Sequence, residues 1–368
     1  MEDRLQEEAT GDCSGDDPVA CAGTDAKGRM GARGPALRFR LRSFAETTST
    51  NDEVKRALEA GEPEGLAVCA RRQVAGYGRQ GRAWSSLDGG LYCSLLLRPK
   101  VDPAVLPTLS LVVGMAVRGA LATLAAGDAA SRVRIKWPND VVLARERGNA
   151  GGMRPRHDRL EENDRYARCS ELRELDDQGF CRSEAGLSAK NRSQPHFCAI
   201  DEDSNGIANR ATKGASESVA AGAPAFAKLC GISLETHAGG VCVGIGVNVV
   251  PPDRRVDVGG KNAPAYVADI APRLMELAAD DALALVRESV LGAFAPLYEA
   301  WLRAGFEPLA GDYGAQELLA GSQVKVVDQT GKGIASGRVV RVDGFGRLVL
   351  RDAAGVETPV SSGEAHIV

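Results

Sequence analysis

The chain has 368 residues, of which 26% are charged and 44% hydrophobic, and its formal net charge is −4. This balance is ordinary for a globular protein and excludes a strongly basic surface for wholesale nucleic-acid binding. The nine cysteines form no C-x-x-C pair and the four histidines lie far apart in the sequence, which argues against a zinc site or a disulfide framework. No stretch reaches the roughly 20 apolar residues of a membrane span, and the acidic N-terminus resembles no targeting sequence. We therefore expect a cytoplasmic protein with room for two domains.

The first part of the chain alternates between strand and helix patterns. Residues 1–36 lack hydrophobic periodicity and predict a disordered tail. A helix is expected from a cap at Ser49 or Thr50 to Gly61, and a second helix over 106–125. Strand patterns cover 37–44, 66–73, 91–99 and 133–143, the last one interrupted by Pro138.

The composition changes over 144–223, where only nine of the 80 residues are Leu, Ile, Val or Phe. So few apolar residues cannot form a core, and the segment predicts a largely disordered insertion. Strand patterns at 226–236 and 239–250 then indicate a hairpin. A helix is expected over 281–305, with a kink at Pro296. The residues from 321 to 368 hold four or five short strand patterns separated by turns, which is typical of a small all-β barrel.

A glycine-rich segment, GYGRQGR at 76–82, combines three glycines with two arginines. One interpretation is an anion-binding loop, because glycines let backbone N–H groups approach a ligand and arginines bind phosphate or carboxylate oxygens. An exposed turn with solvated charges is one alternative. An RNA-binding arginine/glycine segment is another, although it fits poorly because a strand follows directly. The loop alone does not decide between these interpretations.

Six motifs, the loop included, occur in one order along the chain. They are STN (49–51), Q-x-A-G-Y-G-R-Q-G-R-x-W (73–84), GGLYCS (89–94), KWPND (136–140), KLCGISLE (228–235) and GIGVN (244–248). With this set the chain resembles the biotin protein ligases over roughly 37–143 and 224–368. Each motif is weak by itself, but KWPND together with the glycine loop is specific.

The resemblance implies an α+β catalytic domain over 37–312, with a mixed sheet similar to that of class II aminoacyl-tRNA synthetases. The 144–223 insertion would interrupt this domain, and a small SH3-like β-barrel would follow over 319–368. Such enzymes use ATP and Mg²⁺ to form biotinoyl-5′-AMP and transfer the biotinoyl group to a lysine of a carboxylase carrier domain. Some bacterial relatives also carry an N-terminal helix-turn-helix. Since only residues 1–36 precede the first strand, we expect no DNA partner, and no membrane partner; a homodimer remains open.

The same resemblance assigns roles to individual residues. Lys228, Arg79 and Arg82 are expected to be catalytic, because cations offset the charge that builds up when a carboxylate meets a phosphate. Biotin is expected to contact Ser49, Thr50, Asn51, Gln73, Gly76, Tyr77, Gly78, Arg79, Ser94, Lys228 and Gly231. ATP is expected to contact Arg82, Trp84, Lys136, Asn139, Asp140 and Asn248. Mg²⁺ is expected near Asp140, or Asn139.

Taken singly, these residues have simpler interpretations, such as helix caps, solvated lysines and core aromatics. The ordered set of six motifs favours the functional interpretations.

Two positions depart from the family pattern. Tyr77 stands where arginine is usual, and Gln80 where Arg or Gly is common, so the contacts to biotin or phosphate are expected to differ. The alternatives are a lipoate ligase of the same fold, against which the polar biotin residues argue, and a non-catalytic RNA-binding protein that uses the loop and the barrel.

Overall fold

The structure is a computed structural model and describes residues 37–81, 84, 86, 88–145, 225–253, 255 and 263–368. The expected tail at 1–36 lies outside the described residues. The same holds for the expected insertion beyond Arg145, and for Arg82 in the glycine loop. The domain boundaries stated above therefore stay predictions.

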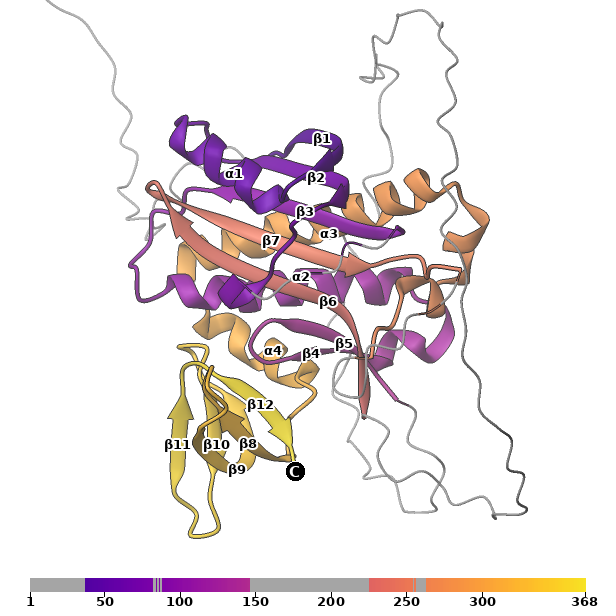
Figure 1. The fold of residues 1–368 in the computed structure, drawn as a ribbon. Coiled ribbons are helices and arrows are strands. Elements are labelled where there is room, and N and C mark those ends of the chain that lie inside the picture. The colour runs from indigo at the N-terminus through magenta and orange to yellow at the C-terminus, as the bar shows by residue number, and fades with distance from the viewer. Residues whose placement is uncertain are drawn as a thin grey trace, which may run out of the picture. The chain divides into compact units, whose positions relative to one another are not determined.

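A seven-stranded mixed sheet is the larger of the two sheets in the described chain (Figure 1). Its strands are β1 (Arg40–Thr47), β2 (Leu66–Gln73), β3 (Gly90–Leu97), β4 (Val133–Lys136), β5 (Asp140–Ala144), β6 (Phe226–His237) and β7 (Gly240–Asn248). They lie in the order β1-β2-β3-β7-β6-β5-β4. β1 and β2 run parallel, and the other neighbours are antiparallel. The predicted mixed sheet is thus confirmed, with Pro138 in the turn between β4 and β5.

Helices cover both faces of this sheet. α1 (Thr50–Glu59) packs on one face through Val54, Ala57 and Leu58. As predicted, the Ser49 side chain caps it by accepting a hydrogen bond from the Asn51 N–H (3.3 Å). α2 (Leu109–Leu124) and α3 (Ala279–Ala304) belong to the core on the other face. α3 continues through Pro296.

Helix α2, with the turn before it, corrects the expectation that no stretch of the chain is long and apolar enough to span a membrane. Leu106–Leu124 is long and apolar enough to span a membrane by length and composition, with a mean hydropathy of 1.4. It is 61% buried within the protein, and Leu111, Val113 and Val117 on α2 are buried in the core. A core helix covered by a sheet and a second helix is apolar for this reason.

Strand alternation separates a core face from an open face. On β7, Val241, Val243, Ile245 and Val247 are buried in the core with α2 and α3. The residues between them include Gly244 and Gly246, and these line a cavity instead. Because side chains alternate along a strand, one sequence segment supplies both surfaces.

The flanks of the expected insertion meet as a hairpin. Ala144 pairs with Phe226, and the Arg145 N–H donates to the Ala225 carbonyl oxygen at 3.0 Å. Ala144, placed in the insertion by composition, is therefore the last residue of β5. The chain leaves the sheet at residue 145 and re-enters it at 225 in adjacent strands.

The C-terminal part is a separate antiparallel sheet, which confirms the predicted all-β pattern. Its five strands lie in the order β11-β10-β9-β8-β12. They are β8 (Gln323–Val327), β9 (Gly333–Val342), β10 (Leu348–Arg351), β11 (Glu357–Val360) and β12 (Glu364–Ile367). The short helix α4 (Ala310–Gln316) leads into it. The described 3-10 helices are η1 (Arg79–Gly81), η2 (Leu106–Thr108), η3 (Gly127–Arg132), η5 (Val267–Asp269), η6 (Pro272–Glu276) and η7 (Glu307–Leu309).

Candidate functional site

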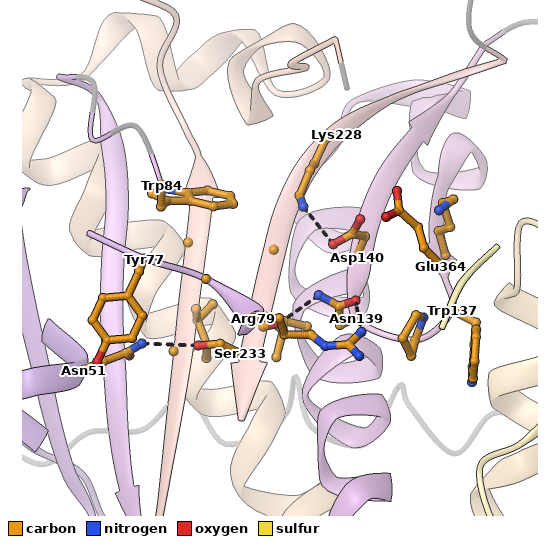
Figure 2. A pocket seen from close by; sticks show the side chains of 18 of the residues that line it. Asn51, Tyr77, Arg79, Trp84, Trp137, Asn139, Asp140, Lys228, Ser233 and Glu364 are labelled. Atoms are coloured by element: carbon orange, nitrogen blue, oxygen red, sulfur yellow. Dashed lines mark hydrogen bonds and ion pairs between the residues drawn. The ribbon is translucent and has the colours of Figure 1, made fainter. Parts of the chain in front are cut away.

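A cavity of about 860 Å³ lies on the α1 face of the large sheet (Figure 2). Most of the residues expected to bind biotin or ATP line it. They are Thr50, Asn51, Gln73, Tyr77, Gly78, Arg79, Trp84, Ser94, Lys136, Asn139, Asp140, Lys228, Gly231 and Asn248. Segments that are far apart in the sequence therefore meet at one concave surface of a size suited to a small ligand.

One end of the cavity is polar and buried. Ser94 is 0% exposed, and its hydroxyl lies 2.7 Å from both Thr50 Oγ1 and Asn51 Oδ1. Asn51 Nδ2 donates to Ser233 Oγ at 3.3 Å, and Gln73 Oε1 accepts from the backbone and hydroxyl of Thr50. Short side chains on α1, β2, β3 and β6 thus form one hydrogen-bonded cluster. Such a cluster offers donors and acceptors to a polar ring.

The floor of the cavity is made of glycine, and Trp84 covers it. Gly231 on β6 pairs with Gly246 on β7. A Cβ on Gly231 would lie 2.7 Å from the Trp84 ring, and one on Gly246 would lie 2.8 Å from it. Both positions therefore require glycine while the indole lies against the two strands. Trp84 Nε1 is buried and has no hydrogen-bond partner among the described residues.

A β-bulge directs Lys228 into the cavity. Along β6, Gly231 and Ser233 line the cavity, so strict alternation would place Lys228 on the opposite face. The β5–β6 register shifts between Val141 and Val142, and Leu229 enters the core instead. Lys228 Nζ then lies 2.8 Å from Asp140 Oδ1 and 5.4 Å from the centre of the Trp84 ring. Asn248 supports the bulge by donating to the Lys228 carbonyl oxygen at 3.0 Å.

The glycine loop is bonded to the KWPND turn. Arg79 Nη1 donates to Asn139 Oδ1 at 2.8 Å, and Asn139 Nδ2 donates to the Ile232 carbonyl oxygen at 3.0 Å. Lys136, at the end of β4, is 9% exposed, and its Nζ lies 5.6 Å from the centre of the Phe226 ring. Three cationic side chains, Arg79, Lys136 and Lys228, therefore line one cavity. This end suits a ligand with negative charge.

Tyr77, the departure from the family pattern, bonds to α1. Its hydroxyl donates to Asp52 Oδ1 at 2.6 Å and accepts from Lys55 Nζ at 3.0 Å. Lys55 in turn pairs with Glu235. Burial and the hydrogen bond to Asp52 raise the pKa of Tyr77 to about 12, so the phenol stays protonated at neutral pH. Tyr77 thus ties the start of the glycine loop to the helix beside the polar end.

Three expected site residues are placed differently from the rest. Ser49 caps α1 and Gly76 lies next to the Gln73 side chain, and neither lines the cavity. Arg82 lies outside the described residues. The cavity also contains residues that the sequence analysis did not single out. Ser233 and Gly244 follow from the two-residue alternation on β6 and β7. Asp328 and Thr330 in the turn between β8 and β9, and Glu364 at the start of β12, had no local signal.

The donor set for a metal ion is small. Asp140 pairs with Lys228, and Asn139 Oδ1 accepts from Arg79. Within the described ranges no group of three or more His, Cys, Asp or Glu side chains could hold a metal ion. These residues fit an Mg²⁺ ion held mainly by phosphates and water, with one carboxylate at hand, and do not fit an all-protein cage.

Comparison with known proteins confirms the resemblance drawn from the motifs. Residues 43–151 match the model of the Biotin/lipoate A/B protein ligase family. Biotin--[acetyl-CoA-carboxylase] ligase of Paracoccus denitrificans is 44% identical over 100 residues, which are 27% of this chain and 40% of that protein. The enzyme of the same name from Mycobacterium tuberculosis is 37% identical over 104 residues, 27% of this chain and 38% of that protein. The chain thus matches about two fifths of the length of these curated relatives.

A solved structure matches over a longer span. The biotin protein ligase of Aquifex aeolicus, solved in complex with biotin and ATP, superposes with a TM-score of 0.55. The match covers 89% of this chain and 98% of that chain, at 21% sequence identity. This confirms the predicted fold, a mixed-sheet α+β domain with a small C-terminal β-sheet.

Proposed function

We propose that this chain is an ATP-dependent biotin protein ligase. The observation that carries the proposal is the two-ended cavity, in which a glycine floor joins a buried polar cluster to a cationic end. Biotin has a polar ureido ring, an apolar chain and a carboxylate, and these match the polar cluster, the apolar Trp84 ring and Lys228 in turn. ATP then lies toward Lys136 and Asn139, with its α-phosphate near the biotin carboxylate.

In the first step, a biotin carboxylate oxygen attacks the α-phosphorus of ATP, and the bond to the β-phosphate oxygen breaks. Pyrophosphate leaves, and biotinoyl-5′-AMP remains. The reaction brings two anions together, so positive charge must already be in place. We assign Lys228 and Arg79 to the stabilisation of the reacting oxygens, and Lys136 to the binding of phosphate. Mg²⁺ bound with the phosphates, beside Asp140, would supply further neutralising charge.

In the second step, the amine of a carrier-domain lysine attacks the carbonyl carbon of the adenylate. The amine loses a proton, AMP leaves, and an amide bond joins biotin to the carrier. The acceptor class follows from the name of the relatives above, acetyl-CoA carboxylase ligases. Carrier domains of biotin-dependent carboxylases are therefore the proposed partners.

The polar end of the cavity also bears on the two alternatives. A lipoate ligase would hold an apolar dithiolane ring, which can exchange no hydrogen bonds with the buried Ser94–Thr50–Asn51 cluster, whereas the ureido ring of biotin can. An RNA-binding role would need the loop arginines at an open surface. Arg79 instead lines the cavity and bonds to Asn139.

The proposal is tested by incubating the full chain with ATP, Mg²⁺ and a purified carrier domain, supplied with either biotin or lipoate. Mass spectrometry of the carrier should show one biotinoyl addition on its acceptor lysine, and none on a carrier whose lysine is replaced by arginine. Modification by lipoate in preference to biotin would contradict the assignment.

A further inference from the structure

Glu317 is a buried carboxylate that neither the motifs nor the cavity lining identifies. It lies between α4 and β8 and is 2% exposed. This connecting segment runs alongside β4, the last strand of the large sheet. Glu317 forms a parallel bridge with Ile135, and the Leu318 N–H donates to the Ile135 carbonyl oxygen at 2.7 Å.

The Glu317 carboxylate accepts hydrogen bonds from two backbone groups. The Trp137 N–H lies 3.1 Å from Oε2 and 3.3 Å from Oε1, and the Leu319 N–H lies 3.0 Å from Oε1. The pairing of β4 with β5 ends at Lys136 and Asp140, so the Trp137 N–H is the first beyond the ladder. The Glu317 carboxylate therefore accepts a hydrogen bond from the buried Trp137 N–H, which has no partner in the β4–β5 ladder.

Trp137 lies at the centre of the KWPND turn. Lys136 precedes it, Asn139 and Asp140 follow it, and all three of these neighbours line the cavity. The indole of Trp137 is held as well, because its Nε1 donates to the carbonyl oxygen of Gly346, in the turn between β9 and β10, at 3.0 Å. The backbone of the turn is thus anchored by Glu317 and its side chain by Gly346.

We propose that Glu317 is a positioning residue, whose carboxylate fixes the backbone of Trp137 and so places Lys136, Asn139 and Asp140 at the nucleotide end of the cavity. This inference rests on the proposed function. The biotin end does not share the anchor, since Ser94, Thr50 and Asn51 lie on β3 and α1. Loss of Glu317 should therefore weaken nucleotide binding much more than biotin binding.

The test compares three variants by biotin-dependent pyrophosphate exchange, together with calorimetric binding of ATP–Mg²⁺ and of biotin. Glu317→Ala removes the acceptor and should raise the KM for ATP about tenfold, with the KM for biotin changed less than about threefold, as expected for loss of one anchor to a buried donor. Glu317→Gln keeps one acceptor oxygen but sets its NH2 group against one of the two backbone donors, so its KM for ATP should lie between those of wild type and Glu317→Ala. Asp312→Ala removes an exposed carboxylate on α4 and is the control.

The outcomes separate the positioning role from a merely structural one. If Glu317→Ala lowers kcat while both KM values stay unchanged, or raises both KM values equally, the positioning role is refuted. If Glu317→Ala does not fold, Glu317→Asp replaces it, because the shorter side chain withdraws the carboxylate from Trp137; the same rise in the KM for ATP alone is expected. A wild-type chain without exchange activity or biotin binding would refute the proposed function itself.

Discussion

Replacing Lys228 by alanine should damage the chemical step more than it damages biotin binding. The Lys228 ammonium lies 2.8 Å from the Asp140 carboxylate, in a pair whose side chains are 23% and 21% exposed. Two unit charges about 4 Å apart interact by about 4 kcal/mol at the effective dielectric of a protein surface, and partial exposure reduces this value. Lys228→Ala therefore removes a cation from the reacting oxygens and also leaves Asp140 to repel them. We expect the adenylation rate to fall about 100- to 1,000-fold, in the range for loss of one charge-stabilising group.

The assay is single-turnover formation of biotinoyl-5′-AMP, with the biotin Kd measured separately. The Kd should rise less than about tenfold, because binding the ground-state carboxylate needs the cation less than the transition state does. The double variant Lys228→Ala/Asp140→Ala should lose less than the sum of the two single losses, by at least about 1 kcal/mol, since the unpaired carboxylate is gone. Equal losses in rate and affinity would refute a role for Lys228 in the transition state.

Three further predictions follow from the described contacts. Burial raises the pKa of Glu317 from 4.5 to about 7, so between these pH values the folded chain keeps a proton that the unfolded chain has lost. The free energy of unfolding should therefore fall by about 3 kcal/mol as the pH rises from below 4.5 through 7. Urea unfolding of Glu317→Gln should lack this pH dependence, and the same pH dependence in both proteins would contradict the prediction. Arg79→Gly removes the bond to Asn139 and should weaken retention of the adenylate about ten- to a hundredfold, seen as biotin on added albumin; labelling no greater than with wild type would count against this. Residues 145 and 225 are hydrogen-bonded to each other, so replacing 146–224 by a short glycine-containing turn should leave kcat/KM within a few-fold of wild type. A loss of kcat/KM beyond about a hundredfold, near 2.7 kcal/mol, would mean that the segment contacts substrate or carrier.

Local sequence signals predicted most of the large sheet and its helices. β2 has the predicted bounds, α1 begins after the predicted cap at Ser49, and the two strands at 226–236 and 239–250 form the predicted hairpin. These features depend on periodicity, capping and turns within about ten residues, which a sequence displays directly. The glycines at 244 and 246 also had a visible signal, because their two-residue spacing places them on one face of a strand.

The orientation of Lys228 could not be predicted in the same way. Its approach to the cavity depends on a bulge in the β5–β6 pairing, and a single extra residue reverses the face on which every preceding side chain lies. Glu317 had still less signal, because its bond to Trp137 joins residues 180 positions apart. A buried carboxylate on a connecting segment looks in the sequence like any exposed glutamate, and only the tertiary structure shows its partners.

The proposed reaction in the cavity joins biotin to ATP, and pyrophosphate exchange measures it directly. The full chain is incubated with ATP, Mg²⁺ and radiolabelled pyrophosphate, with biotin, with lipoate, or with neither acid. Label should enter ATP when biotin is present and stay at background in the other two reactions. A folded chain that exchanges no label in the presence of biotin, or exchanges equally well without it, would not be a biotin protein ligase.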